Sequence, residues 1–279
     1  MASLLALLSS VLWGSADFLG GNLSKRYKAL AVTGSSQAIG LLFGTILIVI
    51  SGGWKAPNLH WSGYFLPAFC AGIAGFIGLT AFYAGLSTGR MGVVSPISTL
   101  SAIIPLTVAF MHGERPRSIQ FIGMAIALVG AFCCSGPEIA AGLPLKPLAL
   151  GLVAAVGFGT ALTFMAMGSK TSALLTMTSM RFFTVSICLL VAFRFRTIGG
   201  FVRKDLPTLA AIGISDFLAN DLLGVATTKG LVSIAMVLGS LFPIVTALLA
   251  FRFLHERLHK VQYTGILLAV AGVALISLS

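Results

Sequence analysis

The sequence predicts an all-α integral membrane protein with ten transmembrane helices, and three observations support this prediction. Hydrophobic residues make up 57% of the 279 residues and charged residues only 9%, whereas a soluble domain has about 25% charged residues. The mean hydropathy of +1.03 is correspondingly high, and the apolar runs reach the roughly 20 residues that a membrane span needs. The runs follow one another closely, so the chain leaves no room for a soluble domain.

The individual spans are apolar runs bounded by Gly, Pro or charged residues. The first residues, Met1 to Leu12, lack the positive segment and the small-residue cleavage site of a signal peptide, so we expect them to belong to the first span. The longest connections, at 52–62 and 197–205, combine Gly, Pro and charge as turns do. The predicted spans are approximately 3–22, 31–51, 63–87, 92–112, 117–135, 146–168, 172–195, 206–228, 230–253 and 260–278.

The two halves of the chain repeat one another. Residues 1–135 and 146–279 share a set of small and charged residues at matching positions, which predicts two five-helix units. Because five is odd, the second unit must enter the membrane from the opposite side, as in the inverted repeats of secondary transporters. The matching residues are Gly14 and Ser24 with Gly159 and Ser169, Trp13 with Phe158, Glu114 with Glu256, and Gly123 and Gly130 with Gly265 and Gly272.

Together these features resemble the EamA family of the drug/metabolite transporter superfamily. The resemblance covers essentially the whole chain and implies alternating access around a central cavity, without ATP. The resemblance says little about the substrate, because the family transports amino acids, other metabolites and toxic compounds. The motifs that carry it are Trp13-Gly14 in the first span, Pro105 with Glu114-Arg115, Pro243 with Glu256-Arg257, and the Gly-rich fifth and tenth spans.

Two acidic residues inside the spans are the first candidate site. Placing Asp at the centre of a membrane helix costs roughly 2.5–3.5 kcal/mol, so such a residue is expected to face a cavity. We call the membrane face at which the first span begins face A and the opposite one face B. Counted from face A, Asp17 and Asp216 share a layer near the midplane with no basic residue at their depth. We predict a proton or cation site there; the alternative is capping by hydroxyl groups or water.

Arg181 and Asp221 form a second predicted layer, closer to face A. They lie on consecutive antiparallel spans, where opposite charges can offset each other's desolvation. We therefore predict a buried ion pair between Arg181 and Asp221. Direct contact with a substrate is the alternative.

Neighbouring side chains complete the candidate substrate site. Trp13 and Asp17 are four residues apart and share a helix face, and Asn220 shares a face with Asp216. A Trp ring beside a carboxylate suits an ammonium group, although Trp13 can equally serve in packing. Ser98 and Ser240, close to prolines in the fourth and ninth spans, are candidate substrate contacts or local partners of a kink. The polar patch at Gln37 can line the cavity or join helices.

The sequence lacks the motifs of other functional classes. The Cys and His residues show no metal-ligand spacing, and no complete nucleotide or hydrolase motif is present, so we expect no metal, no cofactor and no enzymatic activity. The formal net charge is +11, and most of the basic residues lie beside the spans, where they can contact lipid headgroups. We therefore expect no nucleic-acid partner. Glu114 and Glu256 are expected to form interfacial ion pairs beside Arg.

The sequence therefore predicts a secondary active transporter for a small polar metabolite, with an amine-bearing substrate and coupling to protons as the sharper hypothesis. A broad-specificity drug exporter and a non-transporting structural or sensory membrane protein are the alternatives. We expect a multi-pass protein of the cell (inner) membrane, whose partners are a small-molecule substrate and the lipid bilayer; monomer and homodimer both stay open. Face B holds twelve Lys or Arg residues and face A five, which places the termini outside, whereas the family resemblance implies cytoplasmic termini.

Overall fold

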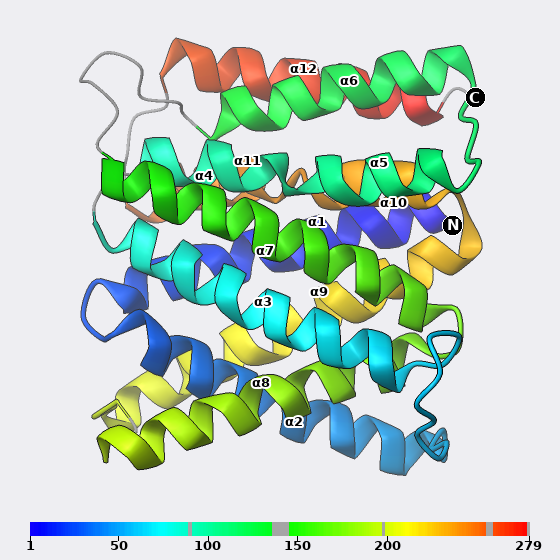
Figure 1. Ribbon diagram of the computed structural model, residues 1–279. Helices are drawn as coiled ribbons and strands as arrows, with labels where there is room; N and C mark the ends of the chain where they lie inside the picture. The colour runs from blue at the N-terminus through cyan, green and yellow to red at the C-terminus, as the bar shows by residue number, and fades with distance from the viewer. Residues whose placement is uncertain (89–90, 136–144, 197–198, 255–258, 278–279) are drawn as a thin grey trace.

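The computed structural model describes residues 1–88, 91–135, 145–196, 199–254 and 259–277, with the backbone alone for 91–93. The elements in these ranges are helices (Figure 1). The first half of the chain forms α1 (Ala2–Ser24), α2 (Ala29–Ser51), α3 (Phe65–Leu86), α4 (Met91–Thr99), η1 (Leu100–Ala102), α5 (Ile103–Met111) and α6 (Ser118–Cys134). The second half forms α7 (Leu145–Ser169), α8 (Ala173–Phe195), η2 (Arg203–Asp205), α9 (Leu206–Lys229), α10 (Val232–Gly239), α11 (Phe242–Phe253) and α12 (Lys260–Ser277).

These helices match the predicted spans. Within the described ranges, nine segments are long and apolar enough to cross a membrane, and α6 is a shorter apolar helix of 17 residues. The fourth span consists of α4, η1 and α5, and the ninth consists of α10 and α11. The prediction of an all-α fold with ten spans is therefore confirmed, with two of the spans interrupted.

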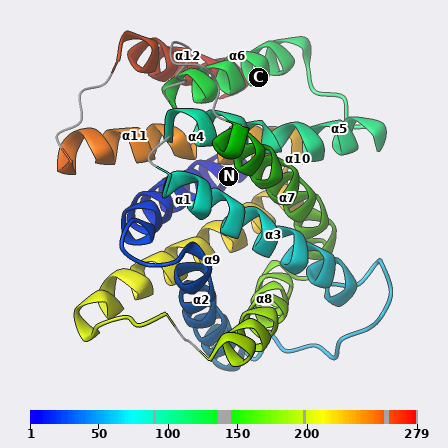
Figure 2. The same ribbon diagram turned by 60° about the vertical axis from the view of Figure 1, so that its left-hand side comes forward.

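The two halves pack against each other helix by helix. The most extensive pairs are α3 with α7, α6 with α12, α1 with α9, and α2 with α8, and each joins one half to the other. Figures 1 and 2 show α6 and α12 side by side at one edge of the bundle and α2 and α8 at the opposite edge. The repeat relates α1 to α7 and α3 to α9. It therefore maps the pair of α1 and α9 onto the pair of α7 and α3. The centre of the molecule is thus built jointly by both halves.

Glycines allow close contact between helices of the two halves. A Cβ atom added to Gly272 on α12 would lie 2.6 Å from the backbone of both Gly123 and Ala127 on α6. On α2, a Cβ atom at Gly44 would lie 2.5 Å from the ring of Phe217. Gly44 ends a Gly40-x-x-x-Gly44 spacing, which predicts close helix approach. Gly89 ends a second such spacing, Gly85-x-x-x-Gly89, and lies outside the described residues.

A buried serine near each interruption bonds to the backbone of its own helix. Ser98 Oγ donates to the Ser95 carbonyl at 2.8 Å, and Ser240 Oγ donates to the Val237 carbonyl at 2.7 Å. Both serines are buried. These bonds are of the local kind, in which a hydroxyl group bonds to the backbone of its own helix; a contact of either serine with the substrate stays a prediction.

Face B carries a polar contact between the halves. Asp205 accepts hydrogen bonds from Arg26 at 2.9 Å and from the Tyr27 hydroxyl at 2.5 Å. The Tyr27 ring also packs on Phe201, with 4.6 Å between ring centroids. The bond to Asp205 raises the pKa of Tyr27, and partial desolvation adds to this. The phenol therefore stays protonated and continues to donate, which ties the α1–α2 connection to the start of α9.

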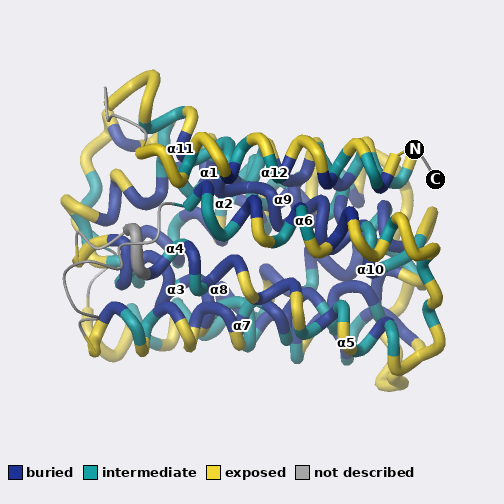
Figure 3. The backbone as a smooth tube through the Cα atoms, turned by 90° about the horizontal axis from the view of Figure 1, so that it is seen from above, coloured by how far each residue is buried: buried dark blue, intermediate teal, exposed yellow. Residues whose placement is uncertain are grey.

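Buried and exposed residues are distributed as expected for a protein in a bilayer. Figure 3 shows buried positions gathered where the helices face one another and exposed positions on the outer sides and ends. Many exposed side chains are large and apolar, such as Leu42, Val49, Leu190 and Val270. An apolar outer surface on apolar helices is suited to lipid contact.

Candidate substrate site

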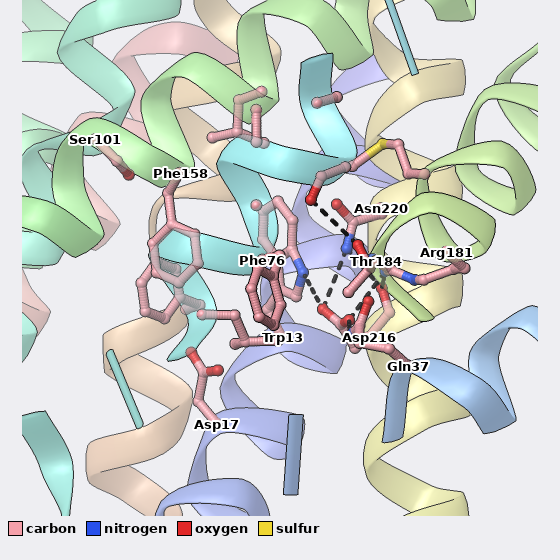
Figure 4. Close-up of a pocket in the computed structure, with 18 residues that line it drawn as sticks. Trp13, Asp17, Gln37, Phe76, Ser101, Phe158, Arg181, Thr184, Asp216 and Asn220 are labelled. Atoms are coloured by element: carbon pink, nitrogen blue, oxygen red, sulfur yellow. Dashed lines mark hydrogen bonds and ion pairs between the residues drawn. The ribbon is translucent and has the colours of Figure 1, made fainter. Parts of the chain in front are cut away.

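A central cavity of about 80 Å³ lies between the two halves. Helices α1, α2, α3 and η1 line it from the first half, and α7, α8, α9 and the start of α11 line it from the second. Most of its wall is apolar or aromatic (Figure 4). The polar side chains in the wall are Asp17, Gln37, Ser101, Arg181, Thr184, Asp216 and Asn220, together with the indole of Trp13.

Asp216 on α9 is the centre of a hydrogen-bond network in this wall. Its Oδ1 atom accepts from the Trp13 indole at 3.1 Å and from Asn220 at 3.2 Å. Its Oδ2 atom accepts from Gln37 at 2.8 Å and pairs with the Arg181 guanidinium at 2.9 Å. Figure 4 shows these donors converging on the one carboxylate. Both oxygens carry two partners, which fills the roughly four acceptor positions of a carboxylate.

The predicted pair between Arg181 and Asp221 is wrong, because Arg181 pairs with Asp216. Residues 216 and 221 differ by about 140° around α9, and the cavity wall includes Asp216 but not Asp221. The sequence also predicted no basic residue near Asp216, because counting residues along a span assumes upright helices and ignores the length of the Arg181 side chain. Asp221 Oδ1 is buried without a hydrogen-bond partner among the described residues.

Asp17 is the second carboxylate in the wall, and its surroundings differ. Within the part of the chain that the structure describes, the Asp17 side chain has no hydrogen-bond or ion-pair partner. Figure 4 shows it on α1 apart from the network at Asp216. Since Arg181 balances the charge of Asp216, an ionised Asp17 leaves one uncompensated negative charge at the cavity.

Aromatic rings form much of the remaining wall. Trp13, Phe76, Phe158 and Phe242 line the cavity from four different helices. Trp13 and Phe242 meet edge to face, with 6.4 Å between centroids. Phe158 is the repeat counterpart of Trp13, so the repeat places an aromatic ring on the cavity wall from each half. An apolar aromatic wall with one free carboxylate is suited to a cation that carries apolar substituents.

A second cavity, of about 100 Å³, adjoins the first on the side of face B. Its wall runs along α1 from Asp17 through Asn22 to Lys25, and it includes Cys134 and Gln262 near the face B ends of α6 and α12. Asp17 lines both cavities. It therefore stands between the central cavity and the space that leads to face B.

The structure thus brings together four of the predicted substrate contacts, namely Trp13, Asp17, Asp216 and Asn220. Ser98 and Ser240 belong to neither cavity wall. Gln37, whose polar patch was predicted to line the cavity or join helices, does both. Phe76 and Thr184 were missed, because an isolated Phe or Thr in an apolar span gives no signal of its own.

Comparisons with known proteins agree with this architecture. The model of the EamA-like transporter family matches residues 1–136 and 145–278. An uncharacterized protein of Methanocaldococcus jannaschii is 28% identical over 130 residues, which span 47% of this chain and 95% of that protein. A solved crystal structure superposes with a TM-score of 0.80 at 18% identity, covering 99% of this chain and 96% of the other, and so shares the fold. The chain is a multi-pass membrane protein that belongs to the EamA-like transporter family.

Proposed function

We propose that this protein is a secondary active transporter of a small amine-bearing metabolite, which it exchanges for protons at Asp17. Its substrate would enter the central cavity by alternating access, with its ammonium group beside Asp17 and its apolar part against the aromatic wall. The bilayer in which it works would be the cell (inner) membrane. The single observation that carries the proposal is the carboxylate of Asp17, which has no partner among the described residues in an otherwise balanced cavity.

The carboxylate oxygens of Asp216 already have hydrogen-bond partners, which favours Asp17 as the site of exchange. A substrate cation or a proton at Asp216 would have to displace Arg181, Gln37, Asn220 or Trp13 from its oxygens. A cation at Asp17 displaces no protein partner among the described residues, and it removes the uncompensated charge. Asp216 is then a positioning residue that holds Trp13 and Gln37 in the wall.

The size of the cavity supports a small substrate over a drug-sized one. Pockets for drug-sized ligands have volumes of roughly 300–1,000 Å³, several times the 80 Å³ of this cavity. A cavity of about 150 Å³ holds benzene. The space therefore suits a ligand group of a few heavy atoms, such as a short alkylammonium.

The position of Asp17 supports exchange with protons. A carboxylate in an apolar wall is costly when ionised and unpaired. Binding a proton or an ammonium group relieves that cost in either case, so the two compete for one site. Because Asp17 also lines the cavity toward face B, a proton can reach it from that side after the substrate leaves.

The test is uptake of short primary amines into proteoliposomes under an imposed pH gradient, with the corresponding alcohols as neutral probes. Uptake is counted above that of protein-free liposomes, because neutral amines cross a bilayer unaided. The wild-type protein should accumulate an amine and no alcohol. Asp17→Asn removes a charge-assisted contact of about 1.5–3 kcal/mol, so gradient-driven uptake should fall roughly 10- to 100-fold.

Asp221→Asn is the matched control, since Asp221 is another acid within the membrane that lines neither cavity. It should leave the coupling of amine uptake to the pH gradient in place. Wild-type amine uptake by Asp17→Asn, with its dependence on the gradient intact, would contradict the proposal.

A further inference from the structure

A second contact between the two halves lies at face A, away from the cavity. Glu114 follows α5, and its carboxylate accepts hydrogen bonds from the backbone N–H groups of Val232 at 2.7 Å and Ser233 at 3.0 Å. These are the first two residues of α10, whose N–H groups have no partner within the helix. The expected pairing of Glu114 with Arg115 is wrong: Arg115 donates instead to the carbonyls of Phe110 and Glu114.

Helix α10 forms part of the packing that closes the protein at face A. Its residues Ala235, Met236, Val237 and Leu238 are at most 1% exposed. They belong to a core cluster that also contains Ala6 of α1 and Leu223 and Ala226 of α9. At the inner end of α10, Gly239 faces Trp13, since a Cβ atom there would lie 3.6 Å from the indole. A tightly packed helix therefore separates the central cavity from face A.

Face B differs in the same structure. There the second cavity leads from Asp17 to Lys25 along α1, and Cys134 forms part of its wall. The described residues thus show a protein that is packed toward face A and hollow toward face B. Opening at face A requires α10 to move away from the first half, which breaks both hydrogen bonds to Glu114.

We infer that Glu114 is a positioning residue for the transport cycle, acting as a latch that holds α10 closed at face A. A carboxylate suits this role, because it accepts two backbone bonds at once and is attracted by the positive end of the helix dipole. The latch joins the end of the fourth span to the start of the ninth, so it acts across the two halves. The inference rests on alternating access but not on the identity of the substrate. Glu256, the repeat counterpart of Glu114, lies outside the described residues.

The test measures how fast introduced cysteines react with a small, water-soluble methanethiosulfonate in purified protein, and it needs no substrate. In a background with all four native cysteines changed to Ala, Ala250→Cys reports on face B, because Ala250 is partly exposed and lines the second cavity. Ala235→Cys in the same background reports on face A. In Glu114→Gln the reaction rate at position 235 should rise about tenfold, as expected from the loss of a charge-assisted bond, while the rate at position 250 falls.

A second variant tests the latch from its other side. Val232→Pro removes one of the two donors and leaves Glu114 in place. Proline is favoured at the first position of a helix, and the preceding Leu231 has the extended backbone, φ −64° and ψ 128°, that proline requires. Val232→Pro should shift both rates in the same directions as Glu114→Gln, by a smaller factor.

Lys170→Gln, at an exposed position of face A away from the latch, is the control for loss of charge there and should change neither rate. Glu114→Asp, which keeps the carboxylate, should restore part of the closed state. Unchanged rates in both Glu114→Gln and Val232→Pro would overturn the inference. So would rates that rise at both reporters, because general loosening exposes both faces, whereas release of a latch opens one face and closes the other.

Discussion

Asp17 and Asp216 line one cavity, but their charges are balanced in different ways. Asp216 is surrounded by an Arg, a Trp, a Gln and an Asn from four helices, with every oxygen position occupied. Asp17 has no such shell among the described residues. The difference between a fixed carboxylate and a free one is what separates a positioning residue from a candidate binding residue.

The pair of Arg181 and Asp216 can be tested by a double-mutant cycle. Their side chains are 6% and 13% exposed, so removing one partner leaves a buried charge uncompensated. Arg181→Met should lower the free energy of unfolding by on the order of 3 kcal/mol. The double variant Arg181→Met with Asp216→Asn should recover much of that loss, as measured by thermal unfolding in detergent.

The same cycle with Asp221→Asn in place of Asp216→Asn provides the matched comparison. If Arg181 pairs with Asp216, this second cycle should show no recovery. Recovery with Asp221→Asn, and none with Asp216→Asn, would restore the pairing that depth counting alone predicts.

At the scale of the helices, most of the fold could be predicted from the sequence. Spans follow from length and apolar composition, and the repeat follows from the spacing of residues such as Gly123 and Gly130 with Gly265 and Gly272. The site could be predicted only in part. A count along the chain places residues at a depth, but it cannot give the tilt of a helix or the reach of a long side chain, so it paired Arg181 with the wrong acid.

The glycine contact between α6 and α12 makes a prediction at this scale. Gly272→Leu would drive a side chain into the backbone of Gly123 and Ala127. Overpacking of this kind costs about 1–3 kcal/mol, so the melting temperature should drop. Gly75→Ala is the control, because its Cβ atom would meet Ala161 at an ordinary 3.5 Å. Equal stability of the two variants would show that α6 and α12 do not pack through Gly272.

At the scale of the whole molecule, both halves contribute residues to the site. The first half contributes Trp13, Asp17 and Gln37, and the second half contributes Arg181 and Asp216. The network at Asp216 joins the halves in the middle of the bundle, and the bonds of Asp205 and Glu114 join them at faces B and A. We propose that a relative movement of the halves changes the access to Asp17 while the spans stay intact.

Exchange of substrate for a proton at Asp17 is tested most directly by asking whether binding of a short alkylammonium releases a proton from that residue. Calorimetric titrations in buffers of different ionisation enthalpy measure that release in the purified protein. We expect proton release on binding in the wild type and in Asp221→Asn, and none in Asp17→Asn. Proton release of wild-type size in Asp17→Asn would contradict this expectation, because another group would then be the one that exchanges a proton for the substrate.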